Sequence, residues 1–153
     1  MTNETKLDAS NAIAIVAAIE NVDPADCDAT ERQSGGFDVR CGDRDYLVCT
    51  DDQATAEATA YVTDSLWAFR SEFLRDYVPA LRDDRACAAF DRMREVLSED
   101  ANGLVLALVG DRLDELVRDA IAADGRGHFL ASYDGAERKV TRAGQTFYVY
   151  RRN

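Results

Sequence analysis

The residues best suited to chemistry lie in one run near the C-terminus, Asp124-Gly125-Arg126-Gly127-His128-Phe129-Leu130-Ala131-Ser132-Tyr133-Asp134-Gly135. This run contains the single histidine of the chain. An imidazole titrates near neutral pH, so His128 could act as a general base, with Asp124, Ser132 or Asp134 as its orienting group or as a nucleophile. The pattern is compatible with a small hydrolase or transferase that uses His128 and nearby carboxylates.

The local geometry expected for this run argues against that chemistry. Side chains alternate along residues 128–133, which predicts a β-strand. On a strand, Ser132 and His128 share a face but lie roughly 13 Å apart, too far for a hydrogen bond. The Gly125-x-Gly127 pair should follow a helix and precede a strand, the reverse of the order in dinucleotide-binding motifs. We therefore favour a protein that is not an enzyme and uses no nucleotide cofactor.

Metal binding is not indicated either. The four cysteines form no C-x-x-C pair, and the histidine lies more than 40 residues beyond the last of them. The closely spaced aspartates do not match a calcium-binding loop. We expect no metal and no cofactor, with free thiols in a reducing cell, although Cys41 and Cys49 could face each other across a hairpin. The cysteines are Cys27, Cys41, Cys49 and Cys87.

Charge is the strongest compositional feature of the 153 residues. The net charge is −11, with a sequence pI near 4.5. Residues 1–124 carry 27 Asp and Glu against 12 Lys and Arg, whereas residues 125–153 carry 2 against 6. An acidic chain is repelled by nucleic acid and by anionic membranes, so direct nucleic-acid binding and membrane association are disfavoured. The natural complement is a partner with a basic surface.

Two sets of residues are candidates for partner contacts. Carboxylates spaced along a surface can imitate the phosphates of DNA, whose charges recur about every 1.7 Å of helix axis. The acidic set comprises Asp23, Asp26, Asp28, Asp38, Asp43, Asp45, Asp51 and Asp52. The basic set, which could dock an acidic partner or contact nucleic acid, comprises Arg126, Arg138, Lys139, Arg142, Arg151 and Arg152.

The elements that position these residues alternate between hairpins and helices. Ser10 is the expected N-cap of a first helix that ends before Pro24, and residues 23–36 read as an acidic connection. Period-2 alternation predicts a hairpin over residues 37–49. A long helix follows, with an inner face predicted to comprise Ala56, Ala60, Tyr61, Leu66, Trp67 and Phe69. More helices fill residues 73–124. Strands return after the Asp134-Gly135 turn, at residues 137–141 and 146–151.

This order predicts an α+β fold. The N-terminal and C-terminal hairpins should join in one antiparallel sheet of four to five strands, because an isolated hairpin is only marginally stable, with the central helices packed against it. We expect a single domain over residues 1–153, with residues 1–8 frayed. No segment reads as a signal peptide or membrane span, which favours the cytoplasm.

Two motifs carry a resemblance to a known group of proteins. They are Asp64-Ser65-Leu66-Trp67-Ala68-Phe69 followed by Phe73-Leu74, and the Gly125–Gly135 run followed by Phe147-Tyr148-Val149-Tyr150-Arg151. Together they resemble small acidic proteins of bacteriophages and prophages, most of unassigned function. The resemblance covers about the C-terminal two-thirds and supplies no catalytic residues. It implies a mobile element inside a bacterial host cell, a setting in which short acidic proteins include anti-CRISPR and anti-restriction inhibitors.

Charge and resemblance together lead to one functional hypothesis and two alternatives. The hypothesis is a phage-type inhibitor of host defence that binds a basic nucleic-acid-handling protein, a CRISPR effector or a restriction enzyme, through a DNA-mimicking acidic surface. One alternative is the His128 enzyme. The other is an accessory protein of DNA metabolism or an assembly protein of a mobile element, with an exposed patch built from Tyr133, Tyr148 and Tyr150.

Overall fold

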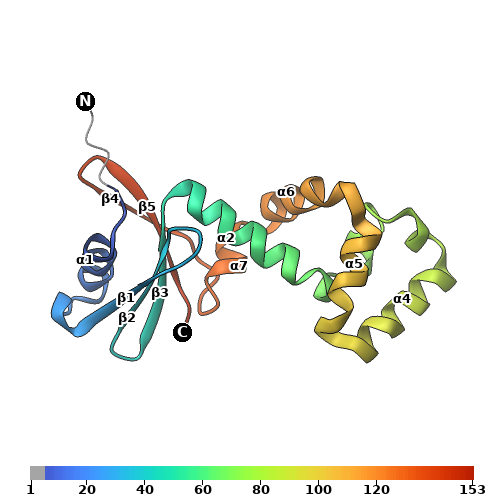
Figure 1. The fold of residues 1–153 in the computed structure, drawn as a ribbon, viewed down its shortest axis with the longest axis horizontal. Helices are drawn as coiled ribbons and strands as arrows, with labels where there is room; N and C mark the ends of the chain where they lie inside the picture. The colour runs from blue at the N-terminus through green and yellow to red at the C-terminus, as the bar shows by residue number, and fades with distance from the viewer. Residues whose placement is uncertain (1–5) are drawn as a thin grey trace. The chain divides into compact units, whose positions relative to one another are not determined.

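The structure is a computed structural model that describes residues 6–153. The chain divides into two compact units. The first, called the sheet unit, comprises Met1–Ala58 and Asp124–Asn153, and the second, called the helical unit, comprises Thr59–Ala123. The chain leaves the sheet unit within α2 (Asp51–Asp64) and returns at the end of α6 (Leu113–Asp124). Each unit is described separately below (Figure 1).

The sheet unit contains one five-stranded antiparallel sheet with the strand order β1-β2-β3-β5-β4. The N-terminal hairpin and the C-terminal hairpin meet through β3 and β5, which confirms the predicted α+β fold with its joined hairpins. The first strand, β1, lies in the stretch that the sequence indicated as a connection. The strands are β1 (Cys27–Glu31), β2 (Phe37–Cys41), β3 (Arg44–Cys49), β4 (Arg138–Arg142) and β5 (Gln145–Arg151).

Tight turns set the register of both hairpins. Gly42 (φ 63°) begins the two-residue turn between β2 and β3, and Ala143 (φ 51°) and Gly144 (φ 78°) form the turn between β4 and β5. Positive φ at both central residues, as at Ala143 and Gly144, defines a type I′ turn, and positive φ at the first alone, as at Gly42, is the pattern of a type II′ turn; the twist of both types matches that of the flanking strands. Each turn therefore fixes which residues face each other, and with them which side chains share a face.

Helix α1 (Ala9–Glu20) covers one face of the sheet, contacting β1 and β2. Its N-cap is Asp8, whose carboxylate accepts a hydrogen bond from the backbone N–H of Asn11 at 2.8 Å, so the assignment of Ser10 as the cap was wrong. Leu7 is buried in the core beneath α1, and Asp8 caps that helix. The prediction of a frayed end is therefore wrong for residues 7 and 8. Residues 1–5 lie outside the described part of the chain.

Helix α2 begins where the sequence predicted, but its inner face was misassigned. The buried residues are Ala54, Ala58 and Val62, while Ala56, Ala60 and Tyr61 are not buried. The other three predicted residues lie beyond the end of α2, and of these Leu66 is buried while Trp67 and Phe69 are half-buried. Small residues occur on both sides of this helix, so composition gave little signal for the phase.

A short helix, α7 (Arg126–Leu130), replaces the strand predicted around His128. Gly125 (φ 80°) ends α6 and turns the chain into it. The apparent period-2 pattern was misleading because Phe129, Leu130 and Ala131 are consecutive buried residues. Consecutive burial of this kind is not the alternation of a half-exposed strand.

The helical unit holds the rest of α2 and a series of short helices. Its α-helices are α3 (Ser71–Leu74), α4 (Asp84–Leu97), α5 (Asn102–Val109) and α6, and its 3₁₀ segments are η2 (Leu66–Ala68), η3 (Pro79–Arg82), η4 (Ser98–Ala101) and η5 (Gly110–Arg112). A further 3₁₀ turn, η1 (Pro24–Asp26), precedes β1 in the sheet unit. Asp83 caps α4 by accepting from the backbone N–H of Ala86 at 2.9 Å.

Candidate functional site

Arg126, in the run singled out from the sequence, is the centre of a polar network in the sheet unit. Its guanidinium donates two hydrogen bonds to the carboxylate of Glu137, Nε to Oε2 at 2.9 Å and Nη2 to Oε1 at 3.2 Å. Nη1 also donates to the side chain of Asp51 at 2.8 Å, to its carbonyl at 3.0 Å and to the hydroxyl of Thr55 at 3.2 Å. Only 13% of the Arg126 side chain is exposed. Arg126 therefore ties α7 to α2 and to the start of β4.

Two tyrosines of β5 complete this network. The guanidinium of Arg126 stacks 4.5 Å from the ring centre of Tyr148, and the buried hydroxyl of Tyr150 donates to Glu137 at 2.6 Å. Burial tends to raise the pKa of Glu137, but the hydrogen bonds from Arg126 and Tyr150 outweigh it and leave that pKa lowered. Burial also raises the pKa of Tyr150, and its bond to Glu137 raises it further. Glu137 is thus held as a carboxylate and Tyr150 as a neutral phenol.

The glycines of the same run have structural roles. A Cβ at Gly127 would lie 2.5 Å from the carbonyl oxygen of Gly135, so the backbones meet too closely for any side chain. His128 projects into solvent, and its ring meets the ring of Phe129 edge-on at 5.0 Å. The run therefore folds as a tightly packed α7 and loop, with its histidine on the surface.

The register divides the eight aspartates of the acidic set between the two ends of the sheet. β1 begins, β2 ends and β3 begins at the same end, which places five of them there, and the other three lie toward the opposite end. Asp38, Asp45 and Asp51 pair with Arg32, Arg40 and Arg126 at 2.8, 3.2 and 2.8 Å. The five at the first end are Asp23, Asp26, Asp28, Asp43 and Asp45, and the three at the other end are Asp38, Asp51 and Asp52.

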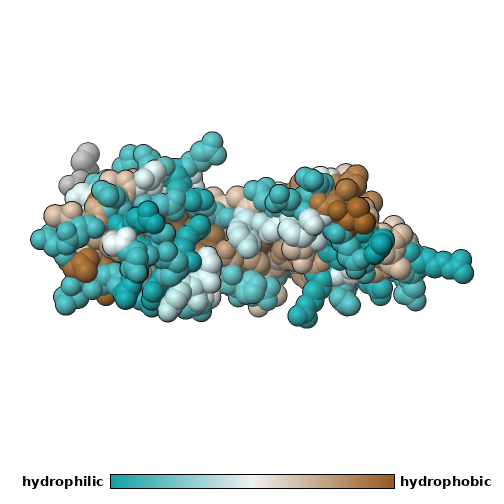
Figure 2. Space-filling model, turned by 90° about the horizontal axis from the view of Figure 1, so that it is seen from below, coloured by the Kyte–Doolittle hydropathy of each residue, from teal (hydrophilic) through white to brown (hydrophobic). Residues whose placement is uncertain are grey.

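Four carboxylates at the first end are exposed and have no ion pair within residues 6–153. They are Asp23, Asp26, Asp28 and Asp43, and we call this group the acidic end. Asp23 also caps η1 by accepting from the backbone N–H of Ala25 at 2.9 Å. Figure 2 shows hydrophilic side chains over most of the visible face of the sheet unit, on the left. Two arginines lie close by, Arg40 directly opposite Asp28 and Arg44 beside Asp43, but neither forms an ion pair with the acidic end within residues 6–153.

The six basic residues fall into three settings. Arg126 is bound internally as described above. Arg151 stacks 3.7 Å from the ring centre of Tyr133, and Arg152 follows it at the end of β5, where its backbone N–H donates to the carbonyl of Asp45 at 2.8 Å. The remaining three lie on the edge strand β4 and are exposed: Arg138, Lys139 and Arg142.

The tyrosine patch considered from the sequence does not form. Tyr150 is fully buried and Tyr148 lies under Arg126, so Tyr133, at 58% exposure, is the exposed member of the three.

The large exposed apolar side chains of the helical unit are Tyr61, Val96, Leu97, Leu104 and Leu108.

The cysteines differ from the expectation of four free thiols. Cys27 and Cys41 form a disulfide between directly opposite residues of β1 and β2, with their Cα atoms 4.3 Å apart. The sequence missed this pairing because β1 was not recognised as a strand, which left Cys49 as the visible partner for Cys41. Cys49 and Cys87 are free and buried. Burial raises the pKa of the Cys49 thiol to about 12, so it is protonated and unreactive at neutral pH.

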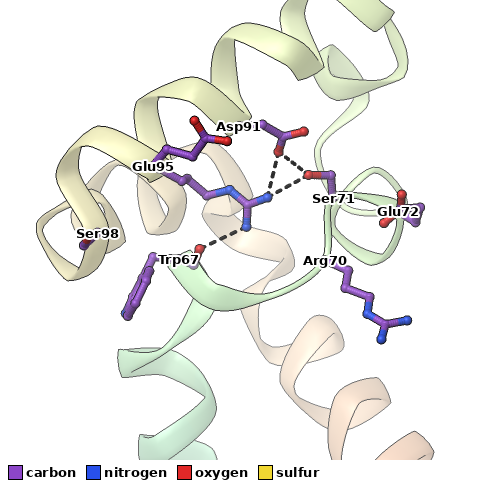
Figure 3. Close-up of a pocket in the computed structure, with 8 residues that line it drawn as sticks. Trp67, Arg70, Ser71, Glu72, Asp91, Glu95 and Ser98 are labelled. Carbon is purple, nitrogen blue, oxygen red and sulfur yellow. Dashed lines mark hydrogen bonds and ion pairs between the residues drawn. The ribbon is translucent and has the colours of Figure 1, made fainter.

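A separate pocket of about 520 Å³ lies in the helical unit, and sequence reasoning did not find it (Figure 3). At its centre, Nη2 of Arg94 donates to the hydroxyl of Ser71 at 2.7 Å and to the carboxylate of Asp91 at 2.8 Å. Nη1 donates to the carbonyl oxygens of Trp67, at 2.9 Å, and Phe69. Arg94 thereby fastens the segment before α3 to α4, which is a structural role.

The Ser71 hydroxyl in this pocket is not set up as a nucleophile. It donates its hydrogen bond to Asp91, which also accepts from Arg94. These two bonds lower the pKa of Asp91, so it is a weak base at neutral pH. The side chains of Arg70 and Glu72 point away from this centre (Figure 3). The arrangement therefore positions backbone and does not assemble a reacting group.

Within residues 6–153, no group of three or more His, Cys, Asp or Glu side chains is arranged to hold a metal ion. Within the same residues, no helix combines the length and the apolar character needed to cross a membrane.

Comparison with known proteins identifies no relative: no family model, no curated protein and no solved structure matches the chain.

Proposed function

We propose that the chain is a non-enzymatic binding protein that presents its acidic end to the basic, nucleic-acid-handling surface of a host protein. The observation that supports this is the acidic end itself, four exposed carboxylates that have no ion pair in the described part of the chain, gathered at one end of a sheet that a disulfide crosslinks. Neighbouring charges of one sign raise the rate at which a basic partner is captured, and a rigid frame reduces the entropy lost on binding.

The resemblance to phage and prophage proteins gives the biological setting of the proposal. In that setting the partner is a CRISPR effector or a restriction enzyme of a bacterial host, and the bound carboxylates occupy a channel that otherwise holds nucleic acid. The protein then acts in the host cytoplasm. The Cys27–Cys41 disulfide argues against a reducing cytoplasm, because disulfides are rare in reducing compartments. Both cysteines are buried, which limits access by reductants.

The partner is identified by a pull-down with the tagged protein from a bacterial lysate that contains active CRISPR and restriction systems. The captured basic protein is then purified and titrated against the chain over a range of salt concentrations. Affinity should fall steeply as salt rises, because the contacts are between exposed charges. Binding that is independent of salt contradicts the proposal.

A matched pair of triple variants locates the surface. Asp23→Asn, Asp26→Asn and Asp28→Asn together remove three charges from the acidic end while Asn keeps the capping oxygen at position 23. The control removes three exposed charges from the helical unit, Asp64→Asn, Glu99→Gln and Asp100→Asn. The first variant should lose most of its affinity and the control should keep it. If the first variant binds the partner as tightly as the unmodified chain does, the proposal is contradicted.

His128→Ala separates this proposal from the enzyme alternative. The histidine is exposed, and its neighbour Arg126 in α7 contacts Asp51 at the end of the sheet opposite the acidic end, so removal of His128 should leave partner binding unchanged. The enzyme alternative is supported if His128→Ala stays folded and bound to its partner but no longer inhibits that partner.

A further inference from the structure

The edge strand β4 offers a second binding surface, independent of the acidic end. β4 is the outermost strand of the sheet, and within residues 6–153 no strand pairs with its outer side. Its sequence is Arg-Lys-Val-Thr-Arg, three cations and no carboxylate in five residues. An edge strand of this kind has backbone groups available for one more strand.

The turn that follows β4 shows which backbone groups face outward. In a hairpin closed by a two-residue turn, the residues that flank the turn form a hydrogen-bonded pair, and bonded and non-bonded pairs then alternate along the strands. Arg142 and Gln145 flank the turn and face each other. Arg138, Val140 and Arg142 therefore bond inward to β5, and the N–H and C=O groups of Lys139 and Thr141 point to the open edge.

The charges next to this edge have few internal partners. Arg138 has one weak ion pair, with Asp134 at 3.5 Å, and Lys139 lies 6.0 Å from the ring centre of Tyr148. No ion pair of Arg142 occurs within residues 6–153. A strand that pairs here can form main-chain hydrogen bonds with β4, and its carboxylates can form ion pairs with the cations of β4.

The sign of the charge selects the kind of partner. The β4 strands of two copies cannot pair with each other without bringing like charges together, which is unfavourable for directly opposite residues. We propose that β4 binds an extended acidic peptide segment of a partner protein by strand addition, through the N–H and C=O groups of Lys139 and Thr141 and the charges of Arg138 and Arg142. Phosphates of a nucleic acid could satisfy the charges and accept from the outward N–H groups, but they have no donor for the outward C=O groups.

The test uses the whole chain and a fluorescent peptide in which Glu alternates with Val and Thr. Thr141→Pro removes one outward N–H and leaves the inward bonds and all charges in place, a substitution that edge strands tolerate. It should weaken peptide binding about tenfold, the value of one hydrogen bond at the upper end of its range. Arg138→Gln with Arg142→Gln should weaken binding to a similar degree and reduce its dependence on salt.

A second probe keeps the test independent of how well Thr141→Pro folds. The same peptide N-methylated at alternate residues retains its carboxylates but loses half of its backbone donors, and it should bind the unmodified chain at least tenfold more weakly than the parent peptide. Shifts in the amide NMR signals of Lys139 and Thr141 should accompany binding of the parent peptide alone.

Three outcomes overturn the proposal. If short single-stranded DNA binds as tightly as the peptide and neither Thr141→Pro nor N-methylation matters, the surface recognises charge alone. If the chain without peptide self-associates and Thr141→Pro abolishes this, the occupant is the acidic edge strand β1 of a second copy. If no peptide binds at low salt, β4 is a protected edge.

Discussion

The side chains of Arg126 and Glu137 form a two-point ion pair, with Nε to Oε2 at 2.9 Å and Nη2 to Oε1 at 3.2 Å. The pair joins a helix to the residue that precedes an edge strand, and Tyr150 and Asp51 satisfy further lone pairs and donors around it. Planar two-point pairing of this kind requires arginine. Since both side chains are mostly buried, loss of one partner leaves the charge of the other buried without an ion pair.

Arg126→Ala should lower the free energy of unfolding by about 2 kcal/mol, because it leaves the Glu137 carboxylate half-buried without its main partner. Arg126→Lys should cost less, since the charge remains but the two-point geometry does not. Urea unfolding followed by circular dichroism measures both effects. Arg142→Ala, at an exposed cation of the same region, is the control and should change stability by no more than about 0.5 kcal/mol. Equal effects at the two arginines would show that the network contributes nothing specific.

Gly127→Ala should destabilise the protein by about 2 kcal/mol or more, because the new Cβ meets the carbonyl oxygen of Gly135 at 2.5 Å and the three nearest atoms all belong to the backbone. The control is Gly103→Ala in α5, where a Cβ meets nothing within 4 Å. That change should stabilise by about 0.5 kcal/mol, since alanine loses less entropy in a helix. Thermal unfolding of the two variants gives the comparison, and a neutral Gly127→Ala would contradict the close approach.

Cys27→Ser with Cys41→Ser should lower stability by about 3 kcal/mol, as expected when a crosslink closes a loop of this length, here a sequence separation of 14. Thiol titration of the denatured protein gives an independent count. Two reactive thiols, Cys49 and Cys87, should appear without reductant and four with it. Four thiols in protein taken directly from the cell would mean that the pair is reduced there.

Stability should fall as the pH drops below about 5. The pKa values of Glu20 and Glu137 are lowered in the folded state, Glu20 mainly by the hydrogen bond from Tyr46 and Glu137 by Arg126 and Tyr150 against the effect of burial. Their contribution is therefore complete above the unfolded pKa, near 4.3, and is lost as the pH falls through the lower folded pKa. Urea unfolding from pH 7 to pH 3 measures this, and Glu137→Gln should show a shallower decline. A flat profile for the unmodified chain would contradict the prediction.

The hairpins could be predicted from the sequence because their signals are local. Alternating side chains and a Gly-containing turn define residues 37–49, and the Ala143-Gly144 turn defines the last pair of strands. The acidic and basic sets were also visible as composition. The division of the acidic set between the two ends of the sheet could not be predicted, because strand register decides which loops lie together.

The sequence by itself determined an α+β fold with joined antiparallel hairpins and a charge that changes sign near residue 125. Tertiary structure alone decided that Cys41 pairs with Cys27, that Arg126 meets Glu137 and Asp51, and that residues 126–130 form a helix. The physical reason is distance along the chain. Asp51 lies 75 residues from Arg126, and no local period records a contact made by side chains that only folding brings together.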